Sequence, residues 1–204
     1  MPAALTERPA LPAAQYPPRK RWTRAECDRA EAAGIFDQQR LELIDGELIV
    51  KMPKNRPHAG TATLLMAWLM QVFGGRRVGA EAPIDVAPED NPTNQPVPDF
   101  FVAKEEYAAS TRFWSASPQP HDLDLVIEIA DTSLVFDLTT KAALYARAGI
   151  TEYWILDVTG RRLLVHRNPE GGQYASVESY SEQESVAPLA APDSSFPIRD
   201  VFPE

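Results

Sequence analysis

Three charged residues in the middle of the chain stand where charge is costly. Asp99 opens one apolar run, Glu128 lies inside another, and Lys141 follows near the start of a helical pattern. An ionised side chain loses its hydration when it is buried, so such a residue is costly unless it binds something. Two carboxylates and a nearby lysine can together hold a divalent metal ion and a phosphate group. The spacing therefore indicates metal-assisted chemistry on a phosphate.

Each carboxylate also has a structural explanation. Asp99 directly follows Pro98 and can be a solvent-facing or turn residue, while Glu128, between Ile127 and Ile129, can lie on an exposed strand face. The pair is more informative than either residue alone. If the two apolar runs are parallel neighbouring strands, they bring Asp99 and Glu128 to one edge of a sheet. We therefore expect parallel pairing at this point.

Lys141 supplies an independent argument. If Asp137 is the N-cap of a helix, Lys141 lies in its first turn, where a cation opposes the helix dipole. Leu138, Lys141 and Tyr145 have the spacing i, i+3, i+7, so the lysine shares a stripe with apolar residues rather than with the polar face. A structural lysine whose stem covers apolar surface is the alternative. An ammonium group directed at the carboxylates explains more of the pattern.

The elements that must position these residues form a mixture of helices and strands. This mixture predicts an α/β fold with a mixed central β-sheet flanked by helices. The apolar run 123–130 is expected to be an interior strand, because it is apolar on both faces. Helices are expected over about 23–34, 58–73 and 138–148, and strands over 41–44, 47–50, 78–80, 84–86, 99–103, 123–130, 152–157, 161–167 and 174–180.

Local signals support several of these elements. Thr23 and Glu26 have the spacing of a capping box at a helix start. Asp45-Gly46 joins two apolar-rich runs, which favours a hairpin because both turn residues must tolerate positive φ. A second hairpin is expected to turn at Thr159-Gly160. Trp114, in the polar loop before residue 123, is a candidate for stacking on a base or lying at an interface.

Length and composition suit one folded domain. Residues 1–20 are rich in proline and are expected to form a flexible arm, followed by a domain over 21–185 and a loop-rich tail over 186–204. The single cysteine, Cys27, rules out an internal disulfide and fits a reducing cytoplasm. No apolar run is long enough to span a bilayer, and the N-terminus lacks the apolar core of a signal peptide. We therefore expect a cytoplasmic protein without a membrane partner.

The charge balance limits the class of partner. Twenty basic and twenty-nine acidic side chains give a net charge of −9. This balance argues against non-specific nucleic-acid binding driven by charge alone, but it leaves room for a local basic groove. Other chemistries lack their signatures, because the histidines have no zinc-site spacing and no glycine-rich phosphate loop is present.

Five motifs, taken in order, resemble the Uma-two family. This mainly bacterial group of restriction-endonuclease-like proteins belongs to the PD-(D/E)XK nuclease superfamily. The resemblance runs from about Arg40 to Arg167 and implies a restriction-endonuclease-like core. The motifs are ELIDGE at 42–47, Pro98-Asp99, VIEI at 126–129, KAALYARAG at 141–149 and TEYWILD at 151–157.

The resemblance implies a role for each charged residue of the central stretch. Asp99 resembles the aspartate of the PD motif and Glu128 the second acidic ligand. With the main-chain carbonyl of Ile129, they would hold Mg²⁺ or Mn²⁺. Lys141 resembles the lysine that in this family lies on the following helix rather than at Ala130, two residues after the glutamate. Lys141 would position or deprotonate the attacking water, or stabilise the transition state.

Three further residues match positions of the family. Glu42 matches an acidic residue of the N-terminal part, which would bind a second metal or orient the water. His58 matches a histidine at a helix start, with either a phosphate contact or a plain structural role, and Asp137 an aspartate before the lysine, as a cap or a lysine-orienting group. This chain departs from the family at Asp131-Thr132, where Ser-Pro is frequent.

The implied function is Mg²⁺-dependent endonucleolytic hydrolysis of DNA. A homodimer is expected from the family resemblance, because cutting both strands commonly uses two active sites. One alternative is a catalytically inactive nuclease-fold module that acts in binding or dimerisation, which the acidic charge favours. Another is a metal-dependent hydrolase that acts on a different phosphate ester.

Overall fold

The computed structural model describes residues 18–37, 39–51 and 55–202, and the side chains of 113 and 114 are not described. The expected arm over 1–20 and the side chain of Trp114 therefore lie almost wholly outside the described part. No helix of the described residues is both long and apolar enough to cross a bilayer.

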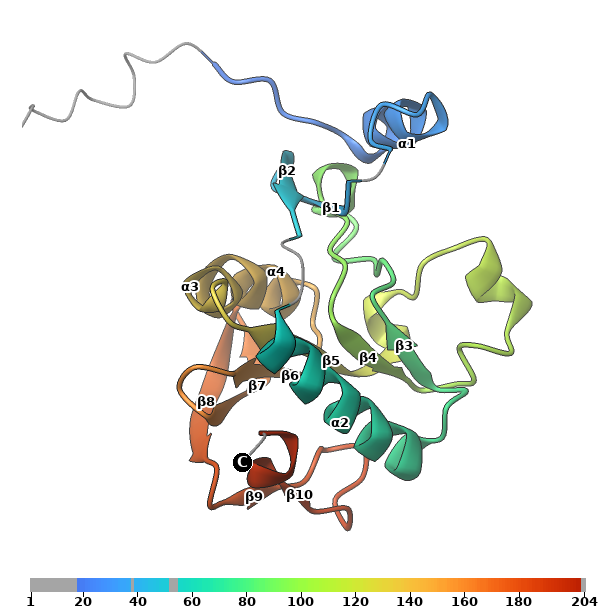
Figure 1. Cartoon of the computed structure of the whole chain (residues 1–204). Helices are drawn as coiled ribbons and strands as arrows, with labels where there is room; N and C mark the ends of the chain where they lie inside the picture. The colour runs from blue at the N-terminus through green and yellow to red at the C-terminus, as the bar shows by residue number, and fades with distance from the viewer. Residues whose placement is uncertain (1–17, 38, 52–54, 203–204) are drawn as a thin grey trace, which may run out of the picture.

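A six-stranded mixed sheet forms the centre of the molecule (Figure 1). Its strand order is β3-β4-β5-β6-β7-β8, which places β5 in the interior as expected. Among these pairs β5 and β6 are parallel, and the other neighbours are antiparallel. The strands are β3 (Val78–Ala80), β4 (Phe100–Ala103), β5 (Leu123–Ala130), β6 (Glu152–Asp157), β7 (Arg162–Glu170) and β8 (Gln173–Ser181).

Helices cover both faces of this sheet and make a three-layer α/β fold. On one face α2 (Arg56–Phe73) packs with the C-terminal segment around the buried Trp154. On the other face α3 (Leu134–Phe136) and α4 (Ala142–Arg147) connect β5 to β6 and pack around the buried Tyr153. The expected α/β class with a mixed sheet flanked by helices is confirmed.

A hairpin and a helix lie beyond one end of the sheet (Figure 1). The hairpin consists of β1 (Leu41–Ile44) and β2 (Glu47–Val50), and its turn residues Asp45 and Gly46 both have positive φ, at 49° and 73°. Helix α1 (Arg24–Ala32) begins at the expected capping box of Thr23 and Glu26. A short bridge between Leu43 and Gln95 connects the hairpin to the loop before β4.

The apolar stretch 84–86 is not a strand, contrary to the prediction. Ile84 is buried, but its N–H donates to the carbonyl of Pro96 in a loop, and the N–H of Val86 donates to the side chain of Asn91. The sequence of this stretch is strand-like because its apolar side chains are buried, although no neighbouring strand pairs with it. Short 3-10 turns occupy Asn91–Thr93, Thr111–Trp114, Pro120–Asp122 and Ile198–Val201.

The C-terminal segment is loop-rich but packs into the core. The ring of Phe196 lies 4.6 Å from that of Trp68 and 5.8 Å from that of Trp154, centroid to centroid. The Thr61 hydroxyl donates to the carbonyl of Val201 at 2.9 Å. Two short strands, β9 (Ser185–Val186) and β10 (Phe196–Pro197), were not predicted.

The helix that carries Lys141 begins earlier than predicted. Ser133 occupies the N-cap position of α3, and a π-helical turn over Asp137–Lys141 leads into α4. Asp137 is therefore not the N-cap, and Lys141 does not lie in the first turn. The Asp137 carboxylate accepts a hydrogen bond from the Ser133 hydroxyl at 2.6 Å, so its polarity is satisfied inside the helix. Gly149, with φ 74°, follows the end of α4.

Candidate active site

Asp99 and Glu128 lie level with each other on neighbouring strands. Phe100 pairs with Ile127 in an antiparallel register, so the expected parallel pairing is wrong although the expected proximity is right. The connection from β4 to β5 contains two 3-10 turns and no crossover helix, which a parallel pair would normally need. The Ile129 N–H donates to Asp99 Oδ2 at 2.8 Å and fixes the aspartate beside β5.

Lys141 is buried at the centre of an acidic cluster. Its side chain is 2% exposed, and its Nζ lies 2.9 Å from Glu128 Oε1, 3.0 Å from Glu42 Oε1 and 3.9 Å from Asp137 Oδ1. The Tyr145 hydroxyl also donates to Glu128 Oε1, at 3.1 Å. The ammonium group does not reach out to solvent, so Lys141 does not snorkel to the surface.

Glu42 joins the β1–β2 hairpin to this cluster. One carboxylate oxygen pairs with Lys141, and the other accepts the N–H of Val97 at 3.2 Å. Val97 comes two residues before Asp99 in the chain, so Glu42 contacts both the lysine and the backbone that leads to the aspartate. In this arrangement Glu42 holds Lys141 in place.

His58 approaches the site from the first turn of α2. Its Nε2 lies 3.7 Å from Asp99 Oδ2, and its Nδ1 is buried without a hydrogen-bond partner in the described part of the chain. Asn55 caps the same helix by accepting the His58 N–H, and its amide donates to Asp131 Oδ2 at 2.6 Å. Asp131, which departs from the family pattern, therefore has a hydrogen-bond partner in Asn55.

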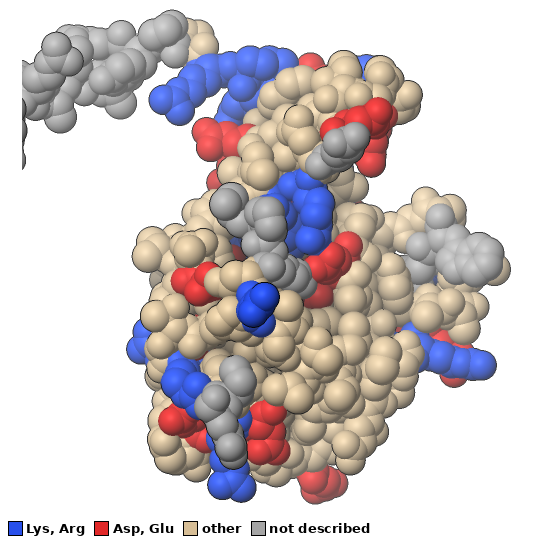
Figure 2. All heavy atoms as spheres, in the orientation of Figure 1, with Lys and Arg blue, Asp and Glu red and all other residues tan. Residues whose placement is uncertain are grey.

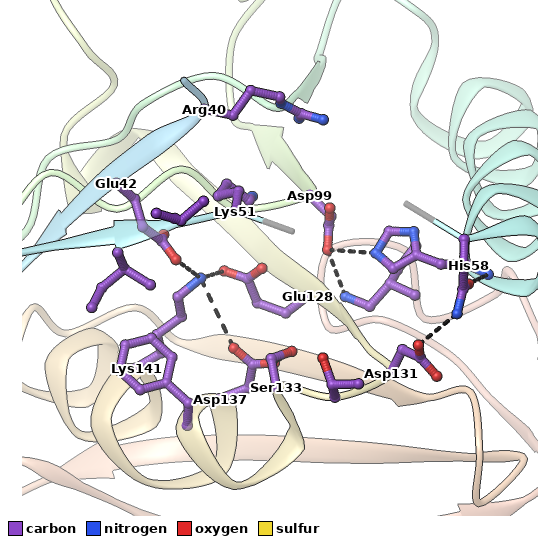
Figure 3. A pocket seen from close by; sticks show the side chains of 16 residues that line it. Arg40, Glu42, Lys51, His58, Asp99, Glu128, Asp131, Ser133, Asp137 and Lys141 are labelled. Atoms are coloured by element: carbon purple, nitrogen blue, oxygen red, sulfur yellow. Dashed lines mark hydrogen bonds and ion pairs between the residues drawn. The ribbon is translucent and has the colours of Figure 1, made fainter. Parts of the chain in front are cut away.

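One pocket of about 140 Å³ collects all of these residues (Figure 3). Every residue that the sequence predicted for the site lines it, namely Glu42, His58, Asp99, Glu128, Ile129, Asp137 and Lys141. Sequence reasoning missed six polar residues of the lining, which are Arg40, Lys51, Asn55, Asp131, Thr132 and Ser133. The signal for Arg40 was its position two residues before Glu42, on the same face of the hairpin.

Burial and crowding shift the proton equilibria of the cluster. Burial raises the pKa of Glu128 to about 8, although the charge of Lys141 lowers it. Burial also raises the pKa of Asp137. Burial alone would lower the pKa of Lys141, but the carboxylates of Glu128, Glu42 and Asp137 raise it above its usual range. The lysine therefore stays cationic, and the surplus of carboxylates favours binding of a further cation or proton.

The oxygen donors fit a magnesium ion better than a zinc ion. No group of three or more histidine, cysteine or acidic residues in the described ranges converges as a metal cage. Mg²⁺ is commonly held by one or two carboxylates together with water and substrate phosphate. Both described hydrogen bonds of Glu128 use Oε1, and Figure 3 shows its carboxylate between Lys141 and Asp99. Asp99 and Glu128 thus form a suitable carboxylate pair.

The fold and this acid–lysine pocket define a nuclease-like protein of the α/β class. The chain belongs to the Uma2 family, described as "Putative restriction endonuclease", whose family model matches residues 26–199. The resemblance inferred from the motifs is therefore confirmed.

A solved structure shares the fold. It is the crystal structure of "a putative nuclease belonging to DUF820" from Anabaena variabilis, with a TM-score of 0.57 and 19% sequence identity. The match covers 79% of this chain and 89% of that chain. At this identity the likeness establishes the fold alone. No curated protein is similar enough to match the chain.

Proposed function

We propose that the protein is a Mg²⁺-dependent endonuclease that hydrolyses phosphodiester bonds of DNA. The observation that carries the proposal is the buried Lys141 ammonium beside Glu128, with Asp99 level on the next strand and all three lining one pocket. Membership of the Uma2 family supports a nuclease. The alternative activity on another phosphate ester would use the same residues and differ in substrate.

Asp99 and Glu128, with the main-chain carbonyl of Ile129, would hold Mg²⁺ or Mn²⁺. When bound there, the ion would supply a water of lowered pKa and would offset negative charge on the phosphate. Lys141 acts as a hydrogen-bond donor to the developing charge rather than as a base, because its raised pKa keeps it protonated. Glu42 orients Lys141, and Asp137 balances the charge of the lysine from the helix.

One observation favours the second candidate, an inactive binding or dimerisation module. Lys141 is already paired with Glu128 and Glu42 at 2.9 and 3.0 Å, and the chain carries a net charge of −9. A lysine fully occupied by carboxylates can be a structural ion-pair centre. The two candidates differ in whether phosphodiester hydrolysis occurs.

Cleavage of supercoiled and linear DNA with Mg²⁺ or Mn²⁺ separates these candidates. We expect the wild-type protein to cut, and D99N and K141A to lose about 100-fold or more in rate, because each removes a charged group from the reacting centre. R76Q is the matched control, since Arg76 is an exposed arginine paired with Glu106. Equal cutting by K141A contradicts the mechanism. Metal binding without any hydrolysis by the wild-type protein favours the inactive module.

We also propose that the protein acts as a homodimer, because cutting both strands of a duplex commonly uses two active sites. Analytical ultracentrifugation measures the molecular mass in solution. We expect twice the 22.6 kDa mass of one chain. A monomer that nicks one strand only contradicts this proposal.

A further inference from the structure

Two cations at the edge of the pocket take no part in the acidic cluster. Arg40 and Lys51 stand opposite each other at the open end of the β1–β2 hairpin, where the Lys51 N–H donates to the Arg40 carbonyl at 2.8 Å. Because strand side chains alternate, Arg40 and Lys51 face the same side as Glu42. Both line the pocket that Glu42 enters.

Lys51 brings a positive charge over the two carboxylates. Its Nζ donates to the carbonyl of Val97, two residues before Asp99. Figure 3 shows Lys51 between the hairpin and Asp99. A neutral carbonyl does not cancel the charge of the ammonium group, which therefore remains available to an anion.

Arg40 extends the same cationic edge outward. Its side chain is 46% exposed and forms an ion pair with Glu81, which follows β3. Figure 2 shows Lys and Arg side chains (blue) beside acidic ones (red) where the hairpin joins the body. An exposed ion pair contributes little free energy, so a phosphate can replace the Glu81 carboxylate at small cost.

We propose that Arg40 and Lys51 bind a backbone phosphate next to the scissile one, which makes the β1–β2 hairpin the substrate-positioning arm. The inference rests on the proposed function. A guanidinium group binds phosphate oxygens in pairs, and an ammonium group binds as a point charge. These two residues give the acidic chain a local attraction for nucleic acid at the pocket where hydrolysis is proposed. Glu42, on the same hairpin face, would couple substrate positioning to Lys141.

Fluorescence anisotropy of a short labelled DNA duplex, with Ca²⁺ replacing Mg²⁺ to suppress hydrolysis, tests this arm. We expect R40Q and K51Q each to raise Kd about tenfold, because each removes a charge-assisted hydrogen bond. The slope of log Kd against log salt should decrease by about 0.9 for each lost phosphate contact. E81Q should lower Kd, because Arg40 then has one competing carboxylate fewer.

Three controls make the test specific. R76Q removes an equal charge at Arg76, which is exposed, paired with Glu106 and absent from the pocket lining, and should leave Kd unchanged. R40K and K51R keep the charge and should retain most of the affinity. Thermal unfolding checks that each variant is folded. If K51Q does not fold, the Kd values of R40Q and E81Q decide whether the positioning arm exists.

The outcomes separate this inference from the proposed function. If the wild-type protein cuts DNA while R40Q and K51Q bind with unchanged Kd and salt slope, the positioning arm is wrong and the nuclease proposal stands. Equal weakening by R76Q also overturns the arm, because the effect is then one of total charge. If the wild-type protein neither cuts nor binds the duplex, the proposed function itself fails.

Discussion

At the scale of single residues, Lys141 balances more negative charge than one ammonium group can neutralise. Three carboxylates surround it within 3.9 Å, and its side chain is 2% exposed. Removing one partner of a buried ion pair leaves an uncompensated buried charge, which is strongly destabilising. The site and the stability of the fold therefore depend on the same lysine.

We predict that K141M lowers the free energy of unfolding by about 3–5 kcal/mol, because Glu42 and Glu128 lose their buried cation. Urea denaturation measures the change. K104M, at an exposed position, is the control and should remain within about 0.5 kcal/mol of the wild-type protein. An equal stability for K141M would contradict the central role of the ion pairs.

Glu128 predicts a dependence of stability on pH. Its pKa is raised by burial to about 8 in the folded protein, against 4.5 for the ordinary side chain. When the pKa of a group is higher in the folded than in the unfolded protein, its contribution to stability is fully present below the unfolded pKa. For Glu128 this contribution is lost as pH rises through its folded pKa of about 8. We predict that E128Q, which can still accept hydrogen bonds from Lys141 and Tyr145, is more stable than the wild-type protein at pH 8. Urea denaturation from pH 5 to pH 9 should show a smaller loss for E128Q, and parallel curves would contradict this assignment.

At the scale of elements, the site depends on an irregular helix. The N–H of Ala142 reaches back five residues to the carbonyl of Asp137, which also accepts the Tyr153 hydroxyl at 3.3 Å. Such π-helical turns frequently occur at functional sites. Apolar spacing predicted that Lys141 and Tyr145 share a stripe, and this is confirmed. The same spacing cannot reveal a π turn, because the extra residue depends on contacts with β5 and β6.

Strand direction marks a second limit of sequence reasoning. The apolar run around Glu128 and the Pro98-Asp99 start were sufficient to predict two neighbouring strands that carry the carboxylates. Their direction depends on the connection over 104–122, whose polar sequence contains no helical pattern. A parallel pair normally needs a crossover helix, so the absence of a helical pattern in this connection was the available signal for antiparallel pairing. Arg40 and Lys51 were missed because single cations are common in any sequence.

Glu152 connects two strands of the sheet, β6 and β7, with the C-terminal segment. Its fully buried carboxylate accepts hydrogen bonds from Arg167, from the Trp154 indole at 2.9 Å and from the Leu189 N–H at 2.7 Å. We predict that E152A lowers the free energy of unfolding by about 3–5 kcal/mol, since the arginine and the backbone donor lose their acceptor. E170A, at an exposed position of β7, is the control. Urea denaturation with a loss below about 1 kcal/mol for E152A would show that this connection is dispensable.

At the scale of the whole molecule, the pocket is assembled from segments that are far apart in the chain. Glu42 comes from the β1–β2 hairpin, His58 from α2, Asp99 from the start of β4, Glu128 from β5 and Lys141 from the helix that follows it. The acidic chain must hold these carboxylates close together against their mutual repulsion. A cation that binds both Asp99 and Glu128 would relieve that repulsion in the folded state alone. It would therefore hold together strands that are distant in the sequence.

Metal binding should therefore stabilise the entire fold. At a free Mg²⁺ or Mn²⁺ concentration 100 times Kd, the expected gain is about 2.7 kcal/mol, seen as a higher Tm in thermal unfolding. D99N should lose most of the metal-dependent increase in Tm, because one of the two carboxylates is neutralised. E106Q, which neutralises an exposed carboxylate near the opposite end of α2, should keep the full increase. If D99N and the wild-type protein gain equally, the ion acts through general screening of the −9 charge rather than through this site.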